Sequence, residues 1–358
     1  MNTRRGANTD IAGLPEALRG KRILITGGTG SFGRQIVKEL LPFEPKTIHI
    51  YSRDEKKQFE MALANQNKRN LVFNIGDVRD LERTRDAMRG VDIVFNAAAL
   101  KQVPNCEYAP FEAVETNIIG ANNVRRAAIE AGVQTVVSIS TDKAVKPVNV
   151  MGMTKAIQER IMLDPTYSTS ETRFLCVRYG NVLGSRGSVV PLFYDHIRKG
   201  RPLPVTHLEM TRFQLTLKEA VQLVLLATVQ GESGDLWVQK MPAARIPDLG
   251  RALALGVTGK ADYPISLIGM RPGEKLHEVL VSEEEMWRAT ELDNYYLIPS
   301  WAKSQGKPSP KRSEVSEYAS GTTHLLTQEE MCTMLESDGW FGAKASSKAQ
   351  YGIELDEE

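Results

Sequence analysis

The chain has 358 residues, of which 42% are hydrophobic and 25% are charged, and its formal net charge is +1. This is the composition of an ordinary soluble globular protein of one or two domains. Such a small charge offers no strongly basic field for phosphates, so nucleic acid is not an expected partner. The longest uncharged apolar run, residues 220–231, is too short to cross a bilayer, so no membrane partner is expected either.

Neither the cysteines nor the histidines follow a pattern typical of metal binding. The three cysteines, Cys106, Cys176 and Cys332, are odd in number, far apart and without CxxC spacing. Structural zinc and disulfides are therefore not expected, and a reducing cytoplasm fits the sequence. The five histidines are equally scattered. Residues 1–20 contain basic residues but no following apolar segment, so they are interpreted as a flexible leader and not as a secretory signal.

From residue 21 onward, short runs rich in β-branched residues alternate with longer amphipathic stretches. Strands are predicted at residues 21–26, 47–52, 71–75, 91–98, 133–140 and 173–180, with helices between them, the first at 31–41. This alternation predicts right-handed βαβ units. The sequence therefore indicates the α/β class, with a doubly wound parallel sheet of the Rossmann type over residues 21–184.

The alternation becomes irregular beyond residue 184, where glycine and proline are frequent. Residues 185–299 are interpreted as a smaller lobe mounted on the sheet, from which some segments can return to the sheet. Residues 300–340 are expected to form an extended polar arm and a short helix at about 327–336. The acidic segment 341–358 is expected to be a disordered tail.

The segment ITGGTGSFG joins the first predicted strand to the first helix and contains Gly27, Gly30 and Gly33. Such glycines permit a tight turn and let backbone amides approach a pyrophosphate at the start of the helix. A purely structural turn is the alternative, but the strand before and the helix after are the context that a dinucleotide site requires. Further contacts to the cofactor are expected from Thr29, Ser31, Phe32, Ser52, Arg53, Asp77, Val78, Ala97, Ala98 and Ala99.

The end of the second strand favours NADP over NAD. An acidic side chain at this place accepts the ribose 2′-hydroxyl, whereas arginine accommodates a 2′-phosphate. Here Ser52 and Arg53 precede Asp54. The alternative is that Asp54 only caps a helix and that Arg53 is solvated. Asp77, after the third strand, is expected to reach the adenine edge.

Six later segments occur in the same order as in a known enzyme family. They read AALKQVP, STDKA, NVMGMTKA, RYGNVLGSRGSVVPLF, THLEMTRF and RPGEKLHE. Together they resemble the inverting UDP-N-acetylglucosamine 4,6-dehydratases of the extended short-chain dehydrogenase/reductase superfamily, over about residues 21–340. The stretch EYASGTTHLL is also similar to the soluble capsule and O-antigen branch. The resemblance implies tightly bound NADP that is regenerated in each turnover, UDP-N-acetylglucosamine as substrate, and a homo-oligomer, either a dimer or a hexamer.

Such a dehydration needs one base and one acid at the edge of the sugar. Removal of a hydride from C4 gives a ketone that acidifies the C5 proton, a base then removes this proton, and an acid helps the C6 hydroxyl to leave before the hydride returns to C6. The TDK segment offers Asp142 as the acid and Lys143 as the base, beside Thr141. Lysine acts as a base only if its pKa is lowered towards neutrality, and Lys155 is expected to contribute to this. The alternative is a helix-capping aspartate and a surface lysine.

Met151 departs from the usual pattern of this superfamily, in which a tyrosine lies four residues before the lysine. Met151 and Lys155 keep the spacing that places them on one helical face. A thioether cannot accept a proton, although Lys155 can still hold the nicotinamide ribose. The proton of the sugar 4-hydroxyl must then go to Lys143, to Asp142 or to a water positioned by Thr141. Methionine at this position also occurs in branches of the family.

The resemblance also implies a nucleotide-sugar site in the second lobe. UDP carries a diphosphate, which arginine binds well through its planar, bidentate donors, and Arg212 and Arg271 are the strongest candidates for this role. The whole set is Lys101, Asn181, Arg186, Ser188, Arg212, Arg271 and Glu274.

Three other functions remain open: a UDP-sugar 4-epimerase, a retaining 4,6-dehydratase and a non-catalytic NADP-binding sensor. A 4-epimerase has no use for an acid–base pair at C5 and C6. A sensor is not expected to keep the Asp–Lys pair, Lys155 and both arginines together.

Overall fold

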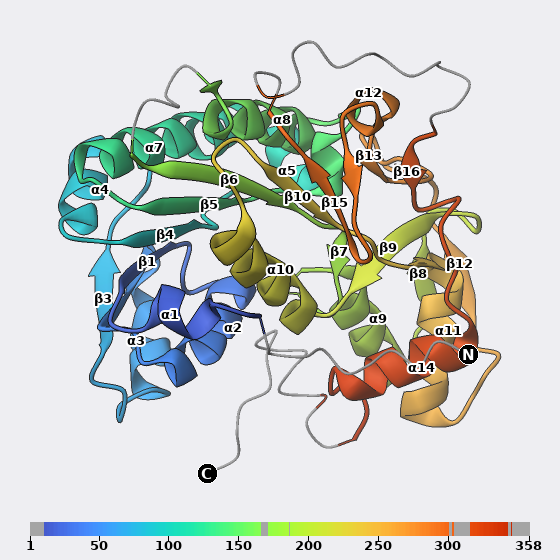
Figure 1. Ribbon diagram of the computed structural model, residues 1–358. Helices are drawn as coiled ribbons and strands as arrows, with labels where there is room; N and C mark the ends of the chain where they lie inside the picture. The colour runs from blue at the N-terminus through green and yellow to red at the C-terminus, as the bar shows by residue number, and fades with distance from the viewer. Residues whose placement is uncertain are drawn as a thin grey trace.

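The computed structural model describes residues 11–165, 171–185, 187–300, 303, 316–342 and 345. A nine-stranded sheet forms the centre of this structure (Figure 1), in the order β14-β15-β10-β6-β5-β4-β1-β2-β3. The strands from β10 to β3 run parallel, and β15 and β14 extend the sheet in the antiparallel direction. The predicted doubly wound α/β sheet is therefore confirmed. Its strands are β1 (Arg22–Thr26), β2 (Thr47–Ser52), β3 (Leu71–Ile75), β4 (Ile93–Asn96), β5 (Thr135–Ile139), β6 (Arg173–Arg178), β10 (Leu236–Gln239), β14 (Thr290–Glu291) and β15 (Tyr295–Ile298).

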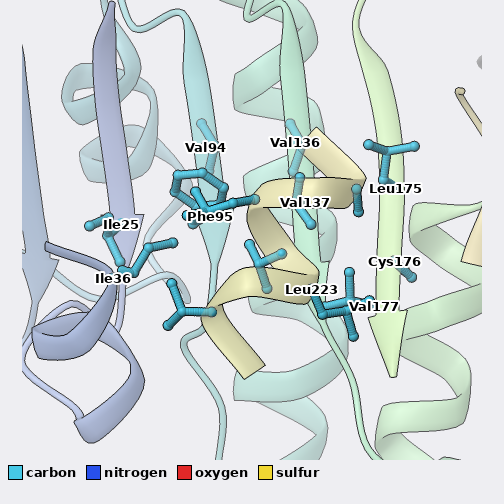
Figure 2. Close-up of a cluster of buried hydrophobic side chains, with 14 of the residues drawn as sticks. Ile25, Ile36, Val94, Phe95, Val136, Val137, Leu175, Cys176, Val177 and Leu223 are labelled. Atoms are coloured by element: carbon cyan, nitrogen blue, oxygen red, sulfur yellow. The ribbon is translucent and has the colours of Figure 1, made fainter. Parts of the chain in front are cut away.

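Helices cover both faces of the sheet (Figure 1), because its parallel strands are apolar on both sides. One face carries α4 (Leu81–Met88), α7 (Gly120–Glu130) and α8 (Val150–Met162), and the other carries α2 (Ser31–Leu40), α3 (Glu55–Leu63) and α10 (Leu217–Gln230). Figure 2 shows part of the core, in which Ile36 of α2 and Leu223 of α10 lie against strand side chains that include Phe95. All three side chains are fully buried.

A short helix precedes the first strand. In α1 (Leu14–Leu18), Leu14 and Leu18 are one turn apart and both are buried in the main core, where α1 packs on α10. Pro15, in the first turn, favours the start of a helix. The interpretation of residues 1–20 as a flexible leader is therefore wrong for residues 14–18, because two leucines at this spacing form an apolar helical face. Residues 1–10 lie outside the described residues.

A second lobe with its own apolar core lies beyond the carboxyl ends of β6 and β10. Its strands are β7 (Asn181–Val182), β8 (Leu203–Val205), β9 (Thr211–Leu215), β11 (Ala243–Arg245) and β12 (Ile265–Leu267), and its helices are α9 (Val189–Arg198), α11 (Ile246–Thr258) and α14 (Gln328–Ser337). The sequence predicts a helix at 327–336, and α14 lies there. Of the predicted arm and tail, residues 301–302, 304–315, 343–344 and 346–358 lie outside the described residues.

The remaining elements are short. Near the cleft, β13 (Val279–Val281) pairs antiparallel with β16 (Tyr318–Ala319). Within the described ranges, no helix combines the length and the apolar character that a membrane span requires. The other short elements are η1 (Leu41–Phe43), α5 (Val103–Tyr108), α6 (Pro110–Ala113), the π-helical η2 (Val114–Ile119), η3 (Asp142–Ala144) and α12 (Glu283–Met286).

Candidate active site

One cleft, with a volume of about 1080 Å³, runs from the glycine turn after β1 to the loops of the second lobe. It lies at the carboxyl ends of the parallel strands, where doubly wound folds bind their ligands. The structure brings most of the predicted site residues to its wall. These are Gly27, Thr29, Gly30, Ser31, Phe32, Ala97, Ala98, Ala99, Lys101, Thr141, Lys143, Met151, Lys155, Asn181, Ser188, Arg212, Arg271 and Glu274.

The glycine turn has the geometry expected of a dinucleotide site. Gly27 has a φ of +65°, and a Cβ atom there would lie 2.9 Å from the carbonyl oxygen of Ala97. Gly30 directly precedes α2, so the positive end of the helix faces the cleft. Gly33 does not line the cleft, because it packs α2 onto the turn: a Cβ atom at Gly33 would lie 2.2 Å from the oxygen of Gly28. Its predicted cofactor contact is therefore indirect.

A polar cluster beside the glycine turn contains Ser52, at the end of β2, and Arg53 and Asp77, which follow β2 and β3. The hydroxyls of Ser52 and Thr29 lie 2.9 Å apart. Arg53, whose side chain is 54% exposed, lies 3.4 Å from a carboxylate oxygen of Asp77. Burial alone would raise the pKa of Asp77, but hydrogen bonds from Arg79 outweigh it and lower the pKa. None of Ser52, Arg53 and Asp77 lines the cleft itself.

Two further details in this region bear on the predictions from sequence. Asp54 caps α3 by accepting a hydrogen bond from the backbone N–H of Lys57, so it has the capping role that was the alternative to a cofactor contact. Val78 is 4% exposed and packs on Gly120 at the start of α7, where a Cβ atom would lie 2.6 Å from its side chain. Val78 therefore supports the helix layer and does not line the cleft.

The TDK turn follows β5 and forms the floor of the cleft. Asp142 is fully buried, and its Oδ1 atom accepts hydrogen bonds from Thr141 Oγ1 at 2.9 Å and from Lys143 Nζ at 3.0 Å. The Oδ2 atom has no hydrogen-bond partner among the described residues. Thr141 and Lys143 line the cleft, whereas Asp142 lies behind them. The predicted pair is thus brought together, with the carboxyl group shielded from the cavity.

The sequence analysis missed a third charged residue of this group, Glu278. Its Oε1 atom lies 3.5 Å from Lys143 Nζ and 3.8 Å from Arg212 Nε, and its Oε2 atom lies 3.6 Å from Lys275 Nζ. The residue lines the cleft but is only 2% exposed. Its position in the motif RPGEKLHE, directly before the apolar run of β13, is the signal that could have identified it.

The pKa of Lys143, in the Asp142–Lys143 pair, is shifted in the direction opposite to the predicted one. Burial is the main cause that raises the pKa of Asp142; Lys143 works to lower it and Glu278 to raise it further. Burial alone would lower the pKa of Lys143, but the charges of Asp142 and Glu278 outweigh it and raise the pKa. The expectation of a lowered lysine pKa is therefore wrong for this structure. The like charge that faces Lys143 is Arg212 and not Lys155.

Met151 and Lys155 lie one turn apart on α8, and both line the cleft. The ammonium of Lys155 donates to the carbonyl of Ile139 and to Gln158 Oε1, both at 2.6 Å. Burial lowers the pKa of Lys155 to about 8. Met151 is 4% exposed and packs with Cys106, so its thioether supplies apolar surface where the superfamily usually has a phenol.

The second lobe contributes polar groups that point to a bound ligand. Asn181 Oδ1 and Ser188 Oγ are buried and have no hydrogen-bond partner among the described residues. Arg212 is 7% exposed and donates to its neighbouring backbone carbonyl of Thr211 at 2.8 Å. Arg271 is exposed, and its backbone N–H donates to Glu274 at 3.1 Å, which closes the turn that carries both residues. Arg186 lies outside the described residues. No three His, Cys, Asp or Glu side chains in the described part of the chain are grouped so that they could hold a metal ion.

The sheet, the glycine turn and the lysine of α8 at the carboxyl edge define a Rossmann-like protein of the short-chain dehydrogenase/reductase type. The chain belongs to the polysaccharide biosynthesis protein family, whose model matches residues 23–300. The superfamily part of the predicted resemblance is therefore confirmed.

Similar proteins place the chain among nucleotide-sugar epimerases and dehydratases. It is 46% identical to a UDP-glucose 4-epimerase of Rickettsia canadensis (strain McKiel) over 327 residues, which cover 88% of this chain and 95% of the relative. The structure of Pen from Bacillus thuringiensis has a TM-score of 0.83 and 37% identity, and covers 89% of this chain and 98% of that one. A dTDP-glucose 4,6-dehydratase from Streptomyces venezuelae shares the fold, with a TM-score of 0.67, 19% identity and coverage of 89% and 98%.

Proposed function

We propose that the protein catalyses the NADP-dependent dehydration of UDP-N-acetylglucosamine to a UDP-2-acetamido-2,6-dideoxy-4-keto-hexose with inversion at C5. The observation that carries this proposal is the Asp142–Lys143 pair, with 3.0 Å between Oδ1 and Nζ, at the floor of the cleft. A reaction that only removes and returns a hydride at C4 needs one group that exchanges the proton of the 4-hydroxyl. Elimination across C5 and C6 needs both a base and an acid.

The residues of the first lobe fit a dinucleotide cofactor. The tight turn at Gly27 and the start of α2 suit a pyrophosphate, and Lys155 is placed to hold the nicotinamide ribose. Arg53, beside Ser52, has an exposed side chain paired with Asp77 and is assigned to a 2′-phosphate, which is the basis for NADP over NAD. When bound, the cofactor supplies an acceptor for the C4 hydride and returns the hydride to C6.

The acid and the base arise from one proton transfer within the pair. If Lys143 gives a proton to Asp142 over 3.0 Å, the result is a neutral amine that faces the cleft and a buried carboxylic acid. Burial of Asp142 raises its pKa and so favours this exchange, whereas the raised pKa of Lys143 opposes it, so the neutral pair is the minor form from which the reaction proceeds. The amine then removes the C5 proton, and after the hydride has returned to C6, C5 takes up a proton from solvent on the opposite face, which gives the inverted configuration. The acid proton reaches the departing C6 hydroxyl through Thr141, whose hydroxyl is bonded to Asp142 at 2.9 Å and lines the cleft.

The proton of the 4-hydroxyl must leave by the same cluster. Met151 cannot accept it, and the Lys155 ammonium is held by Ile139 and Gln158. We assign this step to Lys143, to Asp142 or to a water held by Thr141, since these three residues form one hydrogen-bonded turn at the floor of the cleft.

The second lobe is proposed to bind the UDP moiety. Arg271 and Arg212 supply positive charge, and Asn181, Ser188 and Lys101 supply polar groups along the wall of the cleft. The relatives named UDP-glucose 4-epimerase support a UDP-sugar as the substrate class. A homo-oligomeric assembly, a cytoplasmic location and a role in bacterial surface polysaccharide synthesis remain predictions.

A UDP-sugar 4-epimerase is the second candidate, because several relatives at 45–46% identity carry that name. The same cleft and cofactor site would serve it. The buried acid–base pair favours the dehydratase. Discrimination between the two requires the product.

The test is incubation of the purified protein with UDP-N-acetylglucosamine in deuterated water, followed by mass spectrometry and NMR. We expect loss of water, a 4-keto product, and deuterium at C5 in the L-configuration. Conversion to the C4 epimer without loss of water would replace the proposal with the epimerase. Retained configuration at C5 would indicate a retaining dehydratase. Lys143→Ala should abolish elimination, whereas Met151→Ala should keep measurable turnover.

A further inference from the structure

Glu278 faces the Asp142–Lys143 pair from the second lobe, although the two lie far apart in the sequence. Its carboxylate is 2% exposed and lies 3.5 Å from Lys143 Nζ, which also lies 3.0 Å from Asp142. The ammonium is thus held between two buried carboxylates. Because Glu278 also lines the cleft, the cluster lies where the sugar would bind.

The backbone of Glu278 is fixed by the C-terminal segment. Its N–H donates to Ser320 Oγ at 2.9 Å, and its carbonyl accepts from the N–H of Ser320 at 2.8 Å. Ser320 Oγ also lies 2.7 Å from Thr211 Oγ1, next to Arg212. The pairing of β13 with β16 directly adjoins these contacts, with Val279 opposite Ala319. The stretch EYASGTTHLL therefore has a structural task at the acid–base centre, because it sets the position of a buried charge.

The charged groups around Glu278 come from three directions. Asp142 and Lys143 approach from η3, Arg212 from β9, and Lys275 from the chain before Glu278 itself. On the side of β16, Glu317 is paired with Lys146 in a more exposed contact. Burial alone would raise the pKa of Glu278, but Lys143, Arg212 and Lys275 outweigh it and lower the pKa. The residue is therefore a carboxylate at neutral pH.

We propose that Glu278 is a positioning residue for the acid–base pair: it holds the ammonium form of Lys143 and so sets the pH range in which the pair exchanges protons with the substrate. The inference rests on the proposed dehydratase function for its kinetic consequence. The charged contacts of Glu278 themselves do not depend on that function.

The sign of the effect follows from the charge. A negative group stabilises protonated forms, so loss of the Glu278 charge lowers the pKa of Lys143 and of Asp142. The limb of the pH profile that requires a neutral Lys143 then moves to lower pH, and so does the limb that requires a protonated Asp142. A charge at this separation shifts a pKa by about one to three units, which is the expected displacement of both limbs. Lys143 also becomes a weaker base, so exchange of the C5 proton slows.

The experiment compares the wild type with Glu278→Gln, Glu278→Asp and Glu284→Gln. Glutamine keeps the shape but removes the charge, aspartate keeps the charge, and Glu284 is an exposed residue whose loss of charge serves as the matched control. The pH dependence of kcat/KM for UDP-N-acetylglucosamine and the rate of deuterium incorporation at C5 are measured for each. We expect Glu278→Gln to move the profile to lower pH by at least about one unit. Aspartate and the Glu284 control should keep the wild-type midpoints.

A titration that needs no turnover separates this inference from the proposed function. The ¹³Cε signal of Lys143, identified by its loss in Lys143→Arg, reports the protonation of the amine in lysine-labelled protein. We expect its midpoint to fall in Glu278→Gln and to stay unchanged in Glu284→Gln. An unchanged midpoint in Glu278→Gln overturns the inference even if the wild type is a dehydratase. A lowered midpoint supports the inference even if the wild type does not eliminate water, in which case only the proposed function fails.

Discussion

Replacing Gly152 by alanine tests whether the contact between α8 and the TDK turn positions Lys143. A Cβ atom at Gly152 would lie 2.2 Å from the carbonyl oxygen of Lys143 and 3.1 Å from its carbonyl carbon. Carbon and oxygen atoms in contact keep about 3.3 Å, so α8 and the turn must separate by roughly 1 Å. Both atoms at the clash are on the main chain, and no side-chain rotation relieves it.

The two consequences of this substitution differ in size. Overpacking costs about 1–3 kcal/mol, and the better helix propensity of alanine offsets about 1 kcal/mol of it. The net loss of roughly 0–2 kcal/mol should lower the midpoint of thermal unfolding by only a few degrees. Misplacement of Lys143 by about 1 Å, in contrast, should reduce kcat by roughly 100-fold.

The assay measures kcat for water loss from UDP-N-acetylglucosamine alongside the thermal midpoint. Gly256→Ala in α11 is the matched control, because its Cβ atom would lie 2.1 Å from the ring of Phe341, away from the cleft. This control should lose stability and keep kcat. If Gly152→Ala keeps kcat within about threefold of the wild type, the displacement argument is refuted, since a shift of about 1 Å at a reacting group should reduce kcat far more than this.

Two further substitutions test the helix that carries Lys155. Because burial lowers the pKa of Lys155 to about 8, the unfolded chain binds more protons between that value and the ordinary lysine pKa of 10.5, and stability rises with pH across this window. Between these two pH values, we expect the free energy of unfolding of the wild type to rise by up to roughly 3 kcal/mol relative to that of Lys155→Met. A difference between the two proteins that is the same at both pH values would contradict this. Asn149→Asp keeps the acceptor for the N–H of Gly152 but loses the donor to the carbonyl of Gly273, at 2.8 Å, so KM should rise several-fold with little change in stability. An unchanged KM would exclude this link between α8 and the Arg271 loop.

The features that sequence predicted well are local ones. The strands β1 to β6 follow from apolar runs of the right length, and the turn at Gly27 follows from glycines between a strand and a helix. Asp142, Lys143 and Lys155 come together because the carboxyl end of β5 and the first turns of α8 are consecutive in the chain. Their placement required no knowledge of distant contacts.

The features that sequence missed depend on pairing between distant segments. Glu278 reaches Lys143 only because β13 pairs with β16 and Ser320 holds its backbone. The predicted direction of the shift in the Lys143 pKa was also wrong: Asp142 is the larger of the two charges that raise this pKa, and Glu278, which the sequence did not identify, adds to it. Gly33 and Val78, which were assigned to the cofactor, pack behind the cleft, because sequence spacing does not distinguish a residue that lines a cleft from one that packs behind it.

The methionine at position 151 and the charged cluster at Glu278 are related features of the same acid–base centre. A phenol at position 151 would need a cationic lysine nearby to lower its pKa, but the ammonium of Lys155 is instead held by the carbonyl of Ile139 and by Gln158. The ionisable groups that face the sugar are therefore those of the TDK turn, and their charge is balanced by residues of the second lobe. Since half of this acid–base centre comes from each lobe, a substitution that moves the lobes apart should alter the pH dependence of catalysis and not only the affinity for substrate.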